Sequence, residues 1–96
     1  MIGKNNNTIW KFEMEIKNFQ LVSMPEGAEI LSAKAQNEIP TIWALVNPEN
    51  KKEARSFFII MTGKEIPRNC AMKYISTIQI MKGLYQYVMH IFEKVS

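Results

Sequence analysis

The chain of 96 residues has one cysteine, Cys70, so it can form no disulfide within itself. A fold without disulfides fits a reducing compartment. Cys70 and the only histidine, His90, also fall short of the three or four nitrogen and sulfur ligands that a zinc site needs. We therefore expect a cytoplasmic protein that carries no metal and no cofactor.

Aspartate is absent, and all nine acidic residues are glutamates. Magnesium and calcium loops depend on the short reach of aspartate, so this absence argues against them. Only four glycines occur, and no glycine-rich phosphate loop, nucleophile elbow or nucleophile paired with histidine is present. These absences predict a binding protein rather than an enzyme.

Long apolar runs are missing, and none approaches the roughly 18–20 residues that cross a membrane. The first residues lack the apolar stretch of a signal peptide and include three successive asparagines. We expect residues 1–7 to form a flexible N-terminal arm and residues 8–96 to form a single β domain, since this length suits one core.

What the sequence does contain is a clear alternation from Ile9 to Lys17. Trp10, Phe12, Met14 and Ile16 alternate with charged residues along this segment. A period of two places every apolar side chain on one face of a strand and every charge on the other. The sequence therefore begins with a strand that buries one face in a core.

Strand-like segments separated by turn residues continue to the C-terminus. The predicted strands are 8–17, 19–23, 28–36, 41–46, 54–62, 72–81 and 84–95, and the predicted turns are 24–27, 37–40, 47–50 and the hairpin residues Lys82 and Gly83. Turns at intervals of 8–12 residues are typical of sandwiches and barrels. The expected fold is all-β, either a compact sandwich or a partly open barrel of six or seven mostly antiparallel strands.

Side-chain alternation also predicts which residues form the core. The expected core residues are Trp10, Phe12, Met14, Ile16, Ile30, Trp43, Leu45, Phe58 and Ile60.

The last segment, 84–95, fits two structures. Its apolar residues can be placed on one stripe of a helix, but their types are better strand formers than helix formers. We favour a strand and leave the helix open. As a strand, the segment carries apolar residues on both faces, Tyr85 and Tyr87 on one and Val88 and Phe92 on the other. Both faces would need a cover, so we expect a homo-oligomer, with a dimer favoured.

A loop after the fifth predicted strand is the best candidate for a binding site. Loops held by a rigid sheet often carry binding residues, and this one is basic and is stiffened by Pro67. We expect an anionic ligand to bind to the cations Lys64 and Arg68. Thr62 and the amide of Gly63, at the end of the strand, would donate hydrogen bonds to it, and Tyr74 would provide a stacking surface.

Two other features are weaker candidates. Lys51, Lys52 and Arg55 form a short basic cluster that fits solvated loop charges and would be the next place to look for an anion site. His90 is expected to be an ordinary strand residue, because Glu93 would lie on the opposite face of the same strand and could not pair with it.

Several short segments together resemble an uncharacterised family of small phage and prophage accessory proteins. They run in order along the chain: Ile9-Trp10-Lys11-Phe12, Met24-Pro25-Glu26-Gly27-Ala28, Trp43-Ala44-Leu45-Val46, Thr62-Gly63, Tyr74-Ile75-Ser76-Thr77 and His90-Ile91-Phe92-Glu93. The resemblance implies an accessory protein in the cytoplasm of a host cell and brings no established activity.

Two classes of function remain open. The net charge of +3 is too small to argue for DNA or RNA but is compatible with a small anionic ligand. With the phage resemblance, this favours a binding protein acting in phage–host conflict that sequesters a small anionic nucleotide signal of host immunity. The alternative is a protein–protein inhibitor or assembly module with no small-molecule ligand.

Overall fold

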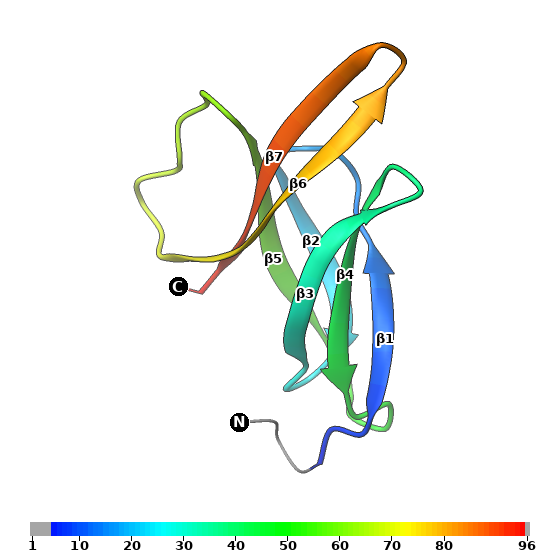
Figure 1. Cartoon of the computed structure of the whole chain (residues 1–96). Helices are drawn as coiled ribbons and strands as arrows, with labels where there is room; N and C mark the ends of the chain where they lie inside the picture. Colours follow the sequence, from blue (N-terminus) through cyan, green and yellow to red (C-terminus); the bar gives the residue numbers. More distant parts are fainter. Residues whose placement is uncertain (1–4, 96) are drawn as a thin grey trace.

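Strands and short turns alternate from end to end in the computed structural model, which describes residues 5–95. Within this range there are seven strands and no helix (Figure 1). The strands are β1 (Thr8–Glu13), β2 (Phe19–Pro25), β3 (Glu29–Gln36), β4 (Ile39–Val46), β5 (Lys52–Met61), β6 (Met72–Lys82) and β7 (Tyr85–Lys94).

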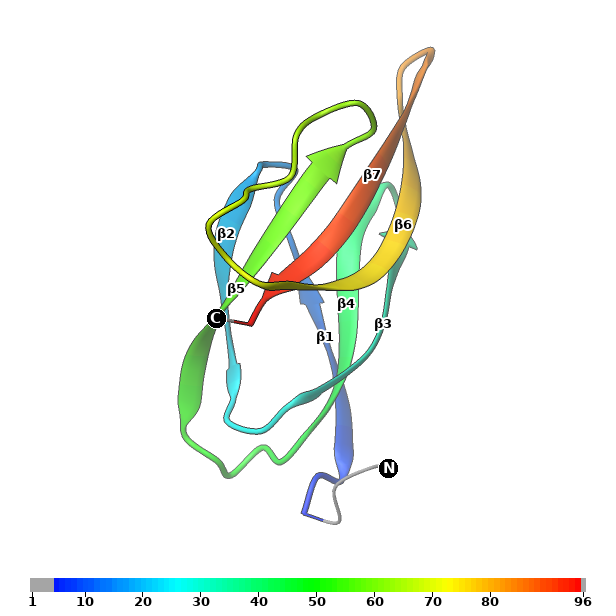
Figure 2. The same ribbon diagram turned by 90° about the vertical axis from the view of Figure 1, so that its left-hand side faces the viewer.

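The strands form two antiparallel sheets that face each other. One sheet has the order β1-β4-β3, and the other has the order β2-β5-β7-β6. Figure 2 shows the four-stranded sheet in front of the three-stranded one. The prediction of an all-β fold, as a sandwich or a partly open barrel, is confirmed, and the two separate sheets make it a sandwich. The final segment is a strand, which decides between strand and helix for residues 84–95.

Two hairpins are closed by two-residue turns. Asn37 and Glu38, with φ of 52° and 63°, join β3 to β4, and two successive positive values are typical of a type I′ turn. Gly83, with φ of 63°, and Leu84 join β6 to β7, because Lys82 pairs with Tyr85. Both turns differ slightly from the prediction, which had extended the first to residue 40 and placed the second at Lys82 and Gly83.

The first strand is shorter than predicted and ends at Glu13. The Met14 N–H still donates to the Pro40 carbonyl at 2.8 Å, but the chain then turns toward the other sheet. Buried Gln20 stabilises this turn, since its amide group donates to the Glu15 carbonyl at 2.7 Å and accepts from the Glu15 N–H at 2.9 Å.

The N-terminal arm is only partly within the described residues, because residues 1–4 lie outside them. The Asn6 side chain donates to the Gly27 carbonyl at 3.0 Å, and the Asn7 N–H donates to the Val46 carbonyl at 3.0 Å. Both asparagines therefore contact the domain.

The core lies between the two sheets and is built from alternate residues of their strands, the edge strand β6 included. It contains Ile42, Ala44 and Val46 of β4, Phe57 and Ile59 of β5, Ile78 and Ile80 of β6, and Met89 and Ile91 of β7. Met14 is buried in it as predicted, and four further predicted residues pack against it while half-buried: Trp10, Phe12, Ile16 and Ile30.

Three predicted core residues were assigned to the wrong face. Trp43, Leu45 and Phe58 are half-buried and belong to the outer faces, because their neighbours in β4 and β5 point inward instead. Both strands are apolar on both sides, so the sequence contains no polar alternation that fixes which side faces the core. Ile60 is buried as predicted, but on the outer side of its sheet.

An ion pair between the sheets joins three distant segments. Arg55 of β5 donates through Nε and Nη2 to the two carboxylate oxygens of Glu93 in β7, at 2.6 and 2.9 Å. Its Nη1 donates to the Ala28 carbonyl, just before β3, at 2.6 Å. The two side chains are only 16% and 12% exposed. Arg55 therefore links the four-stranded sheet to the start of β3 in the other sheet.

Replacing Arg55 by alanine would leave the Glu93 carboxylate half-buried without its partner. We expect the free energy of unfolding to fall by about 2–4 kcal/mol, as for removal of one member of a desolvated pair. Urea denaturation measures this change. Lys17→Ala is the control, because Lys17 pairs with Glu15 at the surface, where the two side chains are 54% and 76% exposed; its effect should stay within about 0.5 kcal/mol. Equal effects of the two substitutions would contradict the role of Arg55.

Candidate functional site

The outer face of the four-stranded sheet carries a row of aromatic rings. Phe19 pairs with Phe58, Phe58 with Phe92, and Phe92 with Tyr74, so the row crosses all four strands. The Phe19 and Phe58 ring centroids are 5.1 Å apart, and those of Tyr74 and Phe92 are 5.6 Å apart. Tyr74 is 55% exposed and Phe19 44% exposed. This face therefore offers aromatic ring surface to solvent at both ends of the row, at Phe19 and at Tyr74.

Residues 62–71 fold back over part of this face. Figure 2 shows this loop passing in front of β5 and β2 before it reaches β6. It explains why Ile60 is only 6% exposed although it lies on the outer side of the sheet. Gly63 begins the loop with φ of 91°, a conformation that favours glycine, and no atom would obstruct an added Cβ there.

Two small pockets lie between the loop and the sheet. The first has a volume of about 260 Å³ and is lined by Ile60, Met61, Thr62, Gly63, Lys64, Ile66, His90 and Phe92. The second, of about 370 Å³, is lined by Asn18, Phe58, Ile60, Met61, Lys64, Glu65 and Pro67. Lys64 contributes to both pockets and supplies a positive charge there.

A chain of hydrogen bonds runs from the residue after β5, across β7, to β6 beside the first pocket. The Thr62 hydroxyl is 2.8 Å from His90 Nε2, and the Thr77 hydroxyl is 2.9 Å from His90 Nδ1. The Tyr74 hydroxyl is in turn 2.7 Å from the Thr77 hydroxyl. The imidazole is thereby held at both nitrogens and lies flanked by hydroxyl groups on the outer face of the sheet.

The hydrogens of this chain can be arranged in two directions. In one, Tyr74 donates to Thr77 and Thr77 to Nδ1, while Nε2–H donates to Thr62, whose hydroxyl lies 3.5 Å from the Val88 carbonyl. In the other, Thr62 donates to Nε2, Nδ1–H to Thr77 and Thr77 to Tyr74, so the Tyr74 O–H is left to donate outward. The face can therefore present Tyr74 to a ligand as either acceptor or donor.

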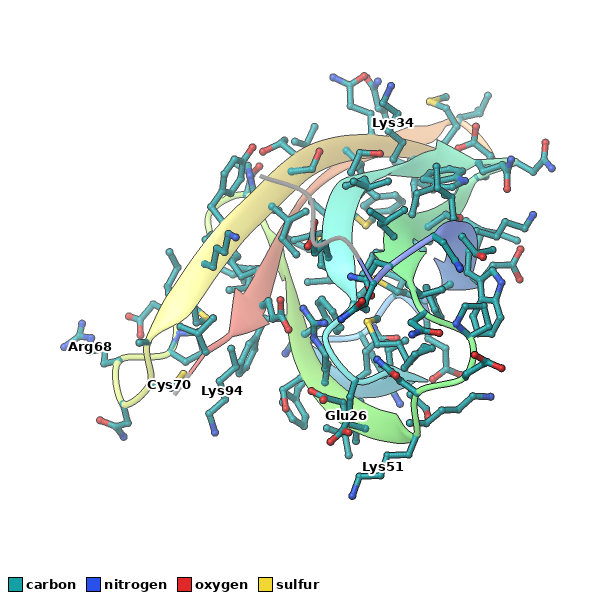
Figure 3. All side chains as sticks on the ribbon, turned by 90° about the horizontal axis from the view of Figure 1, so that it is seen from below. Glu26, Lys34, Lys51, Arg68, Cys70 and Lys94 are labelled. Atoms are coloured by element: carbon teal, nitrogen blue, oxygen red, sulfur yellow. The ribbon has the colours of Figure 1, made fainter. Side chains whose placement is uncertain are left out.

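The structure brings together four of the five predicted site residues. Thr62, Gly63 and Lys64 line the first pocket, and Tyr74 is connected to it through Thr77 and His90. Arg68 is exposed at the outer part of the loop, and its side chain points away from the sheets (Figure 3). Contact between Arg68 and a ligand stays a prediction.

His90 and Thr77 are the site residues that sequence reasoning missed. The sequence feature that could have indicated them is the hairpin between β6 and β7, in which Thr77 lies directly opposite His90. A two-residue turn at Gly83 and Leu84 gives this pairing, whereas the predicted turn, one residue earlier, would have placed Ile75 opposite His90. The prediction that Glu93 lies on the other face is confirmed, since Glu93 pairs with Arg55 between the sheets.

The second candidate site, the basic cluster of Lys51, Lys52 and Arg55, does not offer three cations that are free to bind an anion. Lys51 and Lys52 are exposed, but Arg55 is committed to Glu93 and Ala28. A cleft of about 580 Å³ between the sheets is lined by this ion pair and by Ala28, Glu29, Ile30, Leu31, Lys73, Tyr74 and Ile75. Its most buried charges neutralise each other, so it is a weaker ligand site than the outer face.

Residues 5–95 contain neither a cluster of metal ligands nor a membrane-spanning helix. No three histidine, cysteine, aspartate or glutamate side chains within residues 5–95 lie together in a way that could hold a metal ion. No helix in this range is long and apolar enough to cross a membrane.

Thr77→Val tests the hydrogen-bonded chain, because valine has nearly the same shape but no hydroxyl. We expect the ¹⁵N chemical shifts of the His90 ring to change, since Nδ1 loses its partner, while the free energy of unfolding changes by less than about 1 kcal/mol at this exposed position. NMR of the imidazole measures the effect. Thr8→Val, in β1 of the other sheet, is the control. Unchanged ring signals in Thr77→Val would contradict the chain.

Comparison with known proteins gives a family but no activity. No curated protein and no solved structure matches the chain significantly. The resemblance to phage and prophage proteins stays a prediction. Residues 5–96 match the family described as Domain of unknown function (DUF7352), and since the match covers nearly the whole sequence, the chain belongs to that family.

Proposed function

We propose that the protein binds a small anionic ligand of the nucleotide class on the outer face of its four-stranded sheet. The observation that carries the proposal is the chain Thr62–His90–Thr77–Tyr74, which sets polar groups beside the exposed aromatic ring of Tyr74. A nucleotide has the complementary parts: a flat base for the rings, polar edges for the hydroxyls and imidazole, and a phosphate for a cation.

The position of the cation supports an anionic group at the first pocket. Lys64 lines this pocket, and the Gly63 N–H has no hydrogen-bond partner among the described residues. A charge and a free backbone donor at the end of β5 suit a phosphate oxygen. A pocket of about 260 Å³ is too small for a whole nucleotide, so the base would lie outside it, on the exposed ring of Tyr74.

Binding without catalysis fits the surroundings of His90. Its two ring nitrogens face threonine hydroxyls, and the nearest acid in sequence, Glu93, is paired with Arg55 on the opposite face of the sheet. Catalytic histidines are commonly oriented by a carboxylate. We therefore assign His90 a binding role, as a donor or acceptor toward the ligand.

The setting that we propose follows the phage resemblance. An accessory protein that binds a nucleotide signal of host immunity and releases it slowly would lower the free concentration of that signal in the cytoplasm. No chemistry is needed for such sequestration, so a small binding domain suffices.

A second candidate function is a protein–protein module. It is favoured by exposed apolar residues at the tip of the β6–β7 hairpin, where Leu84 is 96% exposed and Tyr85 is 71% exposed. Salt separates the two functions: a nucleotide held by Lys64 would bind more weakly at high ionic strength, whereas binding through an apolar tip would change little.

A thermal-shift screen of the purified chain against a panel of nucleotides tests the proposed function. A ligand at about 100 times its Kd should add about 2.7 kcal/mol of stability, which raises the melting temperature visibly. Lys64→Ala should weaken binding by about 1.5–3 kcal/mol, the range for a hydrogen bond to a charged group. Tyr74→Ala should weaken it also, through the lost ring.

Lys51→Ala is the matched control, because it removes the same charge at the other end of β5 from the loop. Arg68→Ala tests whether the arginine of the loop reaches the ligand. The nucleotide proposal is contradicted if no nucleotide shifts the melting temperature. Unchanged affinity in both Lys64→Ala and Arg68→Ala would instead place the anion site elsewhere.

A further inference from the structure

The two open sheets leave four edge strands, and one of them differs from the rest. β1, β3 and β6 each carry two charged residues, namely Lys11 and Glu13, Glu29 and Lys34, and Lys73 and Lys82. β2, the outer strand of the four-stranded sheet, has none. Charged residues on an edge prevent it from pairing with another strand. β2 therefore lacks the protection that the other edges of the described chain have.

The free backbone groups of β2 can be assigned from two hydrogen bonds that flank it. The Ile59 N–H donates to the Asn18 carbonyl at 3.1 Å, and the Glu26 N–H donates to the Lys51 carbonyl at 2.8 Å. Hydrogen-bonded and non-hydrogen-bonded pairs alternate along an antiparallel ladder. Even-numbered residues of β2 therefore bond to β5, and the N–H and C=O groups of Phe19, Leu21 and Ser23 point away from it.

These outward groups have no partner among the described residues. The next outward position is Pro25, which has no N–H and so ends the usable edge. The free edge consists of three residues, Phe19, Leu21 and Ser23, evenly spaced about Leu21. An antiparallel copy of the same edge, placed with Leu21 opposite Leu21, would provide hydrogen-bond partners for the free N–H and C=O groups of all three residues in both strands.

We propose that the protein forms a homodimer in which β2 pairs with β2 of a second copy, with Leu21 on the twofold axis. In this register Phe19 lies opposite Ser23 of the partner copy, and each of the three opposed positions exchanges two backbone hydrogen bonds. The two four-stranded sheets join into one sheet of eight strands. The arrangement is isologous, so it closes at two copies and does not extend into a fibre.

Side-chain exposure agrees with this register. Leu21 is 60% exposed, and both it and Phe19 project from the outer face next to the edge. Pairing would place the two Leu21 side chains against each other and cover part of Phe19, which removes apolar surface from water. The reason for a dimer thus differs from the predicted one, because β7 is an inner strand whose Met89 and Ile91 are already covered by the other sheet.

Hydrogen exchange tests the proposal at the level of single amides. In the dimer, the Leu21 and Ser23 amides should become protected at least tenfold as the protein concentration rises through the dissociation constant. The Gln20 and Val22 amides bond to β5 and should be protected at every concentration. Sedimentation of the full chain should show a dimer over the same concentration range.

Leu21→Lys is the disruptive variant, since it places two like charges opposite each other on a free edge. We expect this variant to be a folded monomer. Leu31→Lys is the control, because it alters an exposed leucine of β3 in the other sheet, and it should remain a dimer. A monomeric wild-type chain at hundreds of micromolar, a dimer that survives Leu21→Lys, or amides of Leu21 and Ser23 that exchange fast within a dimer would each overturn the proposal.

Discussion

The pairing of β5 with β7 determines which side chains are available for function. Phe57 and Ile59 point into the core from β5, as do Met89 and Ile91 from β7. Because side chains alternate along a strand, the residues between them must point outward. Phe58, Ile60, Thr62, His90 and Phe92 are therefore on the outer face as a direct consequence of core packing.

The Arg55–Glu93 pair fixes the same inward and outward faces of β5 and β7 at the end of the core. Both residues are on the inward-facing side of their strands, two positions from Phe57 and Ile91 respectively. A shift of β7 by one residue against β5 would turn Glu93 outward, leave Arg55 without its partner and bury His90 and Phe92 instead. Since a half-buried charge without a partner is costly, the ion pair penalises the shifted register more than the aliphatic residues alone would.

Much of the fold could be predicted because local signals are strong where one face of a strand is polar. The alternation in β1 gave its inward face correctly, and turn residues located every strand to within a few positions. Prediction failed for the faces of Trp43, Leu45 and Phe58, since strands apolar on both sides carry no local signal for direction. It could not find the partner of Arg55, because Glu93 is 38 residues away and only the folded ladder brings them together.

The candidate site shows the same division between local and long-range information. Thr62, Gly63, Lys64 and Tyr74 could be proposed from a basic loop at the end of a strand. His90 could not be joined to them, because the pairing with Thr77 depends on the position of a two-residue turn. The aromatic row also requires the register of three ladders at once, which no single segment of the sequence determines.

The proposed dimer and the proposed ligand site are compatible, because they use different parts of one sheet. The site lies on β5, β7 and β6, whereas the dimer forms along the far edge of β2. A twofold axis perpendicular to the joined sheet would put both ligand sites on the same side of the eight-stranded sheet. Two sites on one face would let the dimer hold one ligand with two anionic groups more tightly than one chain alone. The uncharged edge of β2 would thus contribute to binding without contacting the ligand.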